Sequence, residues 1–191
     1  MSFAIEISEV GPAELPLIEV LRDTIFAEFG HISRSTVAAG LTGGQDVFLL
    51  MAHLEGNPLG FSIGYQRTAD SYYINYMAIL RDYRRQGIGR QFMQRQESFA
   101  RARGYETIQF NTQNKFAGMI RLGIAMGYRP IGMEKHHGTM NSLVIRFGKT
   151  FGHVSEDAGL HRALDQGDEI AGLVCDPAND GLKVVLRSEA K

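Results

Sequence analysis

MAILRDYRRQGIGR, residues 77–90, is the most informative stretch of this 191-residue chain. It begins with an apolar run that is typical of a buried strand, and it continues into a basic loop that holds Gly87 and Gly89. From Gly89 to Arg103, apolar and polar residues recur at the spacing of an amphipathic helix. The first backbone N–H groups of a helix have no partners within it, and glycine lets an anion come close to them. We therefore expect a phosphate or pyrophosphate site at this turn.

Three arginines, Arg84, Arg85 and Arg90, surround the same turn and can add charge-assisted contacts to an anion. The alternative interpretation is a basic turn that is merely solvated. Two familiar nucleotide-binding motifs do not fit the stretch. The dinucleotide-binding fingerprint needs a third glycine or alanine where this chain has Phe92, and the P-loop needs a lysine after its last glycine, where this chain has Arg90.

The segments on either side of this stretch predict an α+β fold. Upstream we expect a strand at residues 3–10, a helix at 12–29 and a loop or short helix at 31–45. An antiparallel meander of three strands should follow, at residues 46–54, 58–66 and 72–80. Downstream we expect a strand at residues 107–112 and a helix at 114–126, capped by Asn114 and ended by Gly127. Two more strands should follow, at residues 132–135 and 141–148. The strand–helix–strand order implies one parallel pair, so the sheet is mixed, mostly antiparallel and flanked by helices.

The pattern changes after Thr150. The last residues have the periodicity of a short helix at 155–166 and of a hairpin within 173–186. We therefore predict a main domain at residues 1–149 and a C-terminal extension at residues 150–191. Because a short helix and a two-stranded hairpin are marginal alone, the extension needs a surface to cover, either on the same chain or on a second copy. We expect a homodimer that uses this extension.

Composition and charge exclude several classes of protein. Hydrophobic residues make up 44% of the chain and charged residues 21%, which is typical of a globular protein and not of a disordered one. The formal net charge of −1 argues against a protein that grips nucleic acid through its phosphates. No apolar run is long enough to span a membrane. Cys175 is the single cysteine and the N-terminus does not resemble a signal peptide, so we expect a cytoplasmic protein.

The stretch at 77–90 resembles the acetyl-CoA motif of the GNAT acetyltransferase superfamily. That motif is arginine or glutamine, two variable residues, glycine, one variable residue, and glycine or alanine, and it matches Arg84, Gly87 and Gly89. The family's preceding strand and its following asparagine and Gly-Phe are similar to Met77-Ala78-Ile79, Asn114 and Gly127-Tyr128 here. The family usually has a proline where this chain has Arg81. The resemblance covers residues 3–148, with the specific motifs between 77 and 128.

The resemblance implies that acetyl-CoA is the cosubstrate. Backbone amides from Gln86 to Arg90 would hold the pyrophosphate, and the strand edge at Met77 and Ile79 would pair with the peptide-like pantetheine arm. A backbone N–H at that edge would point at the thioester carbonyl, where negative charge develops. The predicted cofactor-binding residues are Met77, Ala78, Ile79, Arg84, Arg85, Gln86, Gly87, Ile88, Gly89, Arg90 and Asn114.

The sequence contains no specific motif for the acceptor-binding side or for the proton-transfer groups. The family often has a tyrosine four residues before the glycine of Gly-Phe, where its hydroxyl can protonate the departing thiolate, but this chain has Gly123 there. We therefore assign no catalytic residue, and we expect Tyr128 to be a core residue. Candidate acceptor-side residues are Phe29, Tyr76, Glu134 and His136. His136 and its neighbour His137 are better explained as surface residues than as a catalytic base, and neither has another His or Cys at the spacing of a metal site.

These observations predict an acetyl-CoA-dependent N-acetyltransferase that acts on a primary amine of a small molecule or peptide by direct attack, without nucleic acid, membrane or metal. One alternative is a catalytically weak module that only binds CoA or an acyl-CoA. A second alternative is a scaffold whose functional part is the interaction tail at residues 150–191.

Overall fold

The computed structural model describes residues 4–27, 45–135, 143–151, 169–176 and 181–187. The chain divides into two compact units, residues 1–106 and 107–191, which are described separately. The helices and strands of the first unit are β1 (Glu6–Val10), α1 (Leu15–Phe26), β2 (Phe48–Leu54), β3 (Asn57–Gln66), β4 (Ser71–Ile79) and α3 (Ile88–Ala102). Those of the second unit are β5 (Thr107–Gln113), α4 (Ala117–Ala125), β6 (Arg129–Lys135), β7 (Leu143–Thr150), β8 (Glu169–Asp176) and β9 (Gly181–Arg187).

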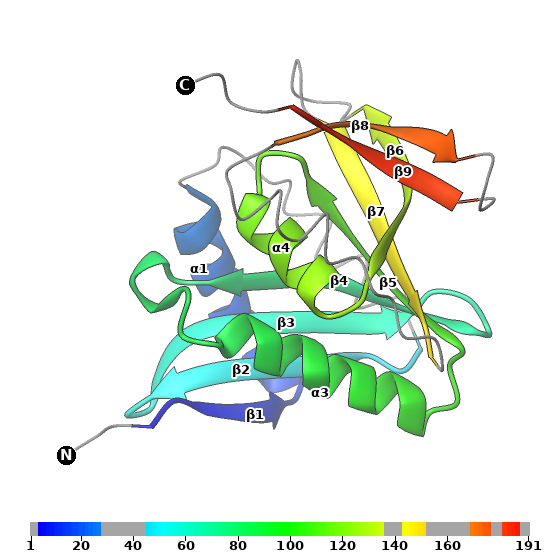
Figure 1. Ribbon diagram of the computed structural model, residues 1–191. Coiled ribbons are helices and arrows are strands. Elements are labelled where there is room, and N and C mark those ends of the chain that lie inside the picture. Colours follow the sequence, from blue (N-terminus) through cyan, green and yellow to red (C-terminus); the bar gives the residue numbers. More distant parts are fainter. Residues whose placement is uncertain (1–3, 28–44, 136–142, 152–168, 177–180, 188–191) are drawn as a thin grey trace. The chain divides into compact units, whose positions relative to one another are not determined.

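The first unit is an antiparallel meander with one helix on each face (Figure 1). Its strands pair in the order β1-β2-β3-β4, so the three-strand meander predicted at 46–80 is confirmed and gains β1 at its outer edge. One face of the meander packs Leu49, Phe61 and Ile63 against the apolar side of α1. Ser62 lies on the opposite face, because side chains alternate along a strand. There it accepts a hydrogen bond from Gln96 of α3 (3.1 Å).

Helix α1 is shorter than the sequence predicts. Residues Pro12–Glu14 form a 3-10 turn, and the α-helix begins at Leu15 and ends at Phe26. Proline suits the first turn of a helix because it lacks the N–H that would be unpaired there, but that signal does not separate a 3-10 turn from an α-helix. The rest of the predicted helix, from residue 28, lies outside the described residues.

Helix α3 agrees with its prediction within one residue at each end. It ends next to Gly104, whose φ of +82° is the left-handed conformation that stops helices. Its buried face carries Gln96, which joins Tyr72, Ser62 and the Phe48 carbonyl in one hydrogen-bond network. Because every partner in this network is buried, the network fixes how α3 sits on the sheet.

The second unit pairs its strands antiparallel in the order β5-β7-β6. Phe110 of β5 stacks on Phe147 of β7, with 5.0 Å between ring centroids, and Tyr128 packs edge-on against Phe110 at 5.1 Å. Tyr128 is only 2% exposed, so its predicted role as a core residue is confirmed. Gly127 ends α4 with a φ of +81°, as the sequence predicts.

Strands β8 and β9 form the antiparallel hairpin that the sequence predicts in the C-terminal extension. Both strands lie next to β6 of the same chain. The predicted helix at 155–166 lies outside the described residues, and the domain boundary near residue 150 stays a prediction. In the part of the chain that the structure describes, no helix is long and apolar enough to cross a membrane.

Candidate functional site

The last residues of β4 direct their backbone groups alternately toward β3 and away from it. Leu80 donates its N–H to the Leu59 carbonyl of β3 (2.8 Å), and the register pairs Gly60 with Ile79 and Ser62 with Met77. In an antiparallel pair, residues alternate between those whose N–H and C=O point to the partner strand and those that point away. Met77 and Ile79 therefore direct their backbone groups away from β3, at the edge predicted to pair with a peptide-like arm.

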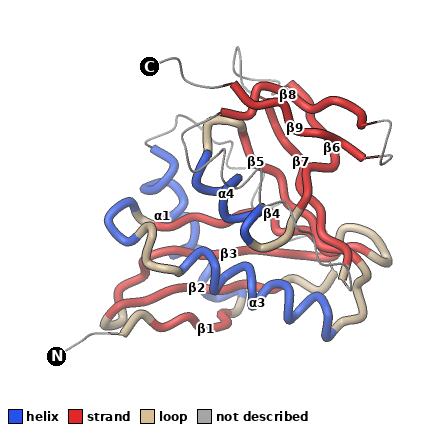
Figure 2. Tube along the Cα trace, in the orientation of Figure 1, coloured by secondary structure: helices blue, strands red, loops and turns tan. Residues whose placement is uncertain are grey.

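A short turn connects this edge to α3 (Figure 2). Residues Arg81–Tyr83 form a 3-10 helix, and Tyr83 donates its N–H to the Leu80 carbonyl (3.0 Å). The Nε of Arg84 then donates to the Ile79 carbonyl (2.9 Å). Arg84 is half-buried. The first arginine of the motif thus ties the loop to the end of the strand, through the outward carbonyl of Ile79.

The turn itself depends on two left-handed residues. Arg85 has a φ of +67° and Gly87, the N-cap of α3, has a φ of +83°. A Cβ placed on Gly87 would meet nothing within 4 Å, so the glycine serves the backbone conformation, and the space beside it is open. Arg85, Gln86, Gly87 and Arg90 are exposed, whereas Ile88 is buried and anchors the helix start.

This geometry fits the pyrophosphate of a CoA-type cosubstrate. The site has the N-terminus of a 15-residue helix whose amides no side chain caps, basic side chains around it, and a glycine at the N-cap. The residues predicted between Met77 and Arg90 come together in this one segment of the first unit. The chemistry is that of an anion cradle with a neighbouring strand edge.

Asn114 has a different role from the predicted helix cap. The N-cap of α4 is Phe116, and no side chain caps that helix. Asn114 instead accepts the Leu143 N–H through its Oδ1 (3.1 Å) and donates its own N–H to the Leu143 carbonyl (2.9 Å). The prediction of a cap was therefore wrong, and the predicted cofactor role of Asn114 stays a prediction.

The acceptor-side candidates are only partly placed. The half-buried ring of Tyr76 packs edge-on against Phe26 of α1, with 6.3 Å between centroids. Glu134 is exposed on β6. Phe29 and His136 lie outside the described residues. Among the described residues, no group of three or more His, Cys, Asp or Glu side chains could hold a metal ion.

Packing explains why position 123 is a glycine. A Cβ at this position would lie 2.6 Å from Cζ of Phe110, whose ring is itself held by Phe147 and Tyr128. The aromatic stack thus takes the space that a side chain at position 123 would need. The position where the resembling family often has tyrosine is therefore closed to side chains in this chain.

Sequence reasoning missed Asn75, which is the extra residue of a β-bulge in β4. Ile63 pairs with Tyr76 and Gly64 pairs with Ile74, so Asn75 has no partner in β3. Bulges of this kind redirect side chains and are frequent next to active sites. Gly64 is the one available signal, since a glycine within a strand often marks a bulge.

The comparisons with known proteins agree with this geometry. The family model of the acetyltransferase (GNAT) family matches residues 17–128, more than half of the chain. None of the curated proteins compared with the sequence matches it. Many solved structures do match, and three are representative.

A GNAT family acetyltransferase from Elizabethkingia anophelis, solved with acetyl-CoA bound, is 19% identical with a TM-score of 0.64, over 77% of this chain and 98% of its own. The ribosomal-protein-S18-alanine N-acetyltransferase from Escherichia coli is 19% identical with a TM-score of 0.65, over 81% and 98%. Arabidopsis thaliana Naa50, in complex with the bisubstrate analogue CoA-Ac-MVNAL, is 14% identical with a TM-score of 0.65, over 77% and 99%.

The fold is that of these acetyltransferases. The chain belongs to the GNAT acetyltransferase family. The α+β fold class predicted from the sequence is confirmed, and acetyl-CoA is the cosubstrate that this family membership assigns.

Proposed function

We propose that this protein transfers an acetyl group from acetyl-CoA to a primary amine of a small molecule or peptide. The observation that carries the proposal is the start of α3, where Gly87 turns the chain left-handed and leaves exposed amides beside open space. Family membership supports the acetyltransferase chemistry. The choice of an amine is supported by two similar structures, one of an N-acetyltransferase of a ribosomal protein and one bound to a CoA–peptide analogue.

The residues of the site divide the binding between them. The backbone amides from Gln86 to Arg90 hold the pyrophosphate, and the exposed Arg85 and Arg90 add positive charge. Arg84 acts indirectly, because its Nε holds the Ile79 carbonyl and thereby fixes the loop against the strand. The outward backbone groups of Met77 and the outward N–H of Ile79 pair with the amides of the pantetheine arm.

The protein's main contribution to the reaction is alignment. The amine nitrogen attacks the thioester carbonyl carbon, a C–N bond forms, the C–S bond breaks, and the sulfur leaves with its electron pair. A backbone N–H at the outward edge of β4 stabilises the charge that develops on the carbonyl oxygen. Holding the two reactants in contact accelerates such a step without a covalent enzyme intermediate.

The proton released by the amine ends on the CoA sulfur. Position 123 offers no hydroxyl for this transfer, and the ring of Phe110 leaves no space for one there. A thiol with a pKa of about 8.5 leaves tolerably well with solvent as the acid. We therefore propose direct transfer in which water, and not a tyrosine at this position, protonates the thiolate.

The test is the release of free thiol from acetyl-CoA with a panel of primary amines and peptides. The proposal requires thiol release that rises with amine concentration, together with acetylated product detected by mass spectrometry. CoA binding measured by calorimetry separates the alternatives. CoA binding without amine-dependent turnover would identify a binding module, and no CoA binding would remove the proposed site altogether.

A further inference from the structure

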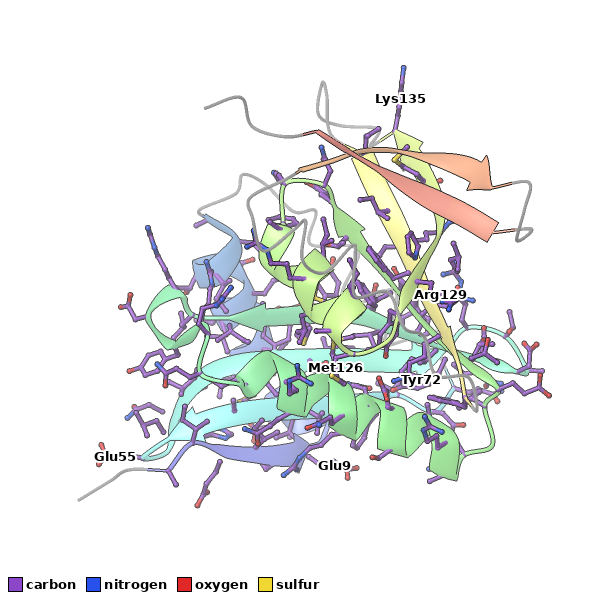
Figure 3. The ribbon with its side chains drawn as sticks, viewed as in Figure 1. Glu9, Glu55, Tyr72, Met126, Arg129 and Lys135 are labelled. Carbon is purple, nitrogen blue, oxygen red and sulfur yellow. The ribbon has the colours of Figure 1, made fainter. Side chains whose placement is uncertain are left out.

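The sheet of the second unit carries a polar row on the face that α4 does not cover. Helix α4 lies over Phe110, because Gly123 of that helix approaches its ring. The next residue of β5, Asn111, therefore faces the other side of the sheet. The register places Asn111 opposite Arg146 of β7, and Arg146 opposite Gly132 of β6. These three residues form the row, which runs across all three strands between the ends of β6 that Arg129 and Lys135 mark in Figure 3.

Two polar atoms of the row are buried without a hydrogen-bond partner. They are Oδ1 of Asn111 and Nε of Arg146. Side chains directly opposite on antiparallel strands have Cβ atoms roughly 5 Å apart, so these groups are neighbours. They nevertheless do not bond to each other. Buried polar atoms in native proteins are nearly always satisfied, so two unsatisfied atoms in one row indicate a missing partner.

Gly132 explains where the guanidinium lies. A Cβ built on this glycine would sit 2.7 Å from Nη2 and 3.0 Å from Nε of Arg146. The guanidinium thus rests directly over the glycine backbone of β6, turned away from Asn111. Asn111 and Arg146 are both half-buried as residues, so part of each side chain is exposed to solvent although these two atoms are not.

The chemistry of the row favours a carboxylate. The guanidinium is permanently charged and presents a planar set of N–H donors that matches a carboxylate. The amide of Asn111 carries an NH₂ as well as an oxygen, and a half-turn of the amide group exchanges the two. With its NH₂ turned toward Arg146, Asn111 is a second donor to the same carboxylate. The row itself contains no acidic side chain. Glu134, two residues after Gly132 on β6, is exposed.

The geometry points to a carboxylate-binding site formed by Asn111 and Arg146 over Gly132. The carboxylate belongs either to the amine acceptor or to a free organic acid. In the first case the inference rests on the proposed function and narrows the acceptor to an amine that also bears a carboxylate. In the second case the site is independent of acetyl transfer.

The binding test measures thermal unfolding of the full chain in acetate, in succinate and in chloride at equal ionic strength. Both carboxylates should raise the midpoint above its value in chloride, because a ligand that binds only the folded state stabilises it. Arg146→Gln should abolish this difference. Arg101→Gln, at an exposed position on α3, is the matched control and should keep it.

Asn111→Asp protects the test against a variant that fails to fold. It keeps the shape of the side chain and supplies Arg146 with an internal carboxylate, so the protein should remain stable and lose its response to acetate and succinate. If the parent protein unfolds at the same temperature in carboxylate and in chloride, neither carboxylate binds, and water is the hydrogen-bond partner of Asn111 and Arg146. That result, or a response that survives in Asn111→Asp, would overturn the inference.

The acceptor test compares phenylalanine with 2-phenylethylamine, which share an amine and a ring and differ in the carboxylate. If the site serves the acceptor, Arg146→Gln should lower kcat/KM for phenylalanine at least tenfold and leave that for 2-phenylethylamine unchanged. Unchanged rates, with the carboxylate response lost, assign the site to a free acid. Thiol release absent with every amine, with the carboxylate response intact, would refute the proposed function and not this site.

Discussion

At the scale of single residues, the backbone of the loop before α3 matters more than its side chains. Arg85 and Gly87 both take left-handed conformations, and for a residue with a Cβ this costs roughly 1–2 kcal/mol. Such strain persists where the surrounding structure fixes it, and it gathers at functional sites. The hydrogen bond from Arg84 to the Ile79 carbonyl is one contact that fixes this loop.

The role of Gly89 can be tested by Gly89→Val. The added side chain at the second residue of α3 should block close approach of the pyrophosphate and weaken CoA binding by about 1–3 kcal/mol, the cost of losing hydrogen bonds to a charged group. Calorimetry measures the change. Gly118→Val is the matched control, because Gly118 is the second residue of α4 and a Cβ there meets nothing within 4 Å. Unchanged CoA affinity in folded Gly89→Val would remove the cradle assignment.

At the scale of elements, two contacts position the helices of the units. In the second unit, α4 lies close to the sheet because Gly123 has no side chain against Phe110. In the first unit, the end of α3 is joined to Asp46, two residues before β2. Arg103 pairs with Asp46 (2.7 Å), and the Tyr105 hydroxyl donates to Asp46 (2.6 Å). Each contact leads to a prediction.

Gly123→Ala should destabilise the protein by about 1–3 kcal/mol, as expected when a methyl group is forced into a packed core. Chemical unfolding measures this loss. Gly118→Ala, on an exposed position of the same helix, should instead be neutral or stabilise by up to roughly 1 kcal/mol. Gly123→Tyr should unfold the domain and not restore a general acid. A folded Gly123→Tyr variant with faster turnover would contradict this explanation of the glycine.

Tyr105 predicts a loss of stability in alkali. Burial, and then the hydrogen bond to Asp46, raise the pKa of Tyr105 to about 12 from its ordinary value of 10. Above pH 10 the unfolded state releases this proton while the folded state keeps it, so the contribution of Tyr105 is complete below pH 10 and is lost as the pH rises through 12. Tyr105→Phe should lower the free energy of unfolding by about 1 kcal/mol at pH 7. Urea titrations between pH 7 and 11.5 should show this difference shrink above pH 10, and a constant difference would refute the assignment.

At the scale of the whole molecule, the C-terminal extension adds a two-stranded hairpin to the chain. Strands β8 and β9 lie next to β6, so the hairpin covers part of its own chain. We also propose that the extension joins two copies of the chain, since symmetric pairing covers apolar faces and exposed strand edges. Strand β7 ends at Thr150, which makes this residue a clean point of truncation.

Light scattering on the full chain and on a chain that ends at Thr150 tests the proposed dimer. The full chain should have the mass of a dimer and the shortened chain that of a monomer, while circular dichroism shows that the shortened chain is folded. A monomeric full chain would refute the proposal. A dimer that survives truncation would place the interface within residues 1–150.

The sequence by itself determined the class of protein, because its signals are local. A strand, a basic loop with two glycines and an amphipathic helix predicted both the cofactor class and the end of each neighbouring element to within a few residues. Helix periodicity and left-handed glycines at 87, 104 and 127 depend only on residues a few positions apart.

The tertiary structure decided what depends on distant residues. The bulge at Asn75 turns Ile74 and Tyr76 to opposite faces, although both are even-numbered residues that simple alternation places on one face. Asn114 bonds to Leu143 and not to the next helix, and this partner lies 29 residues away in the sequence. The row of Asn111, Arg146 and Gly132 exists only through strand register. Partners of this kind are chosen by chain packing, which no local pattern encodes.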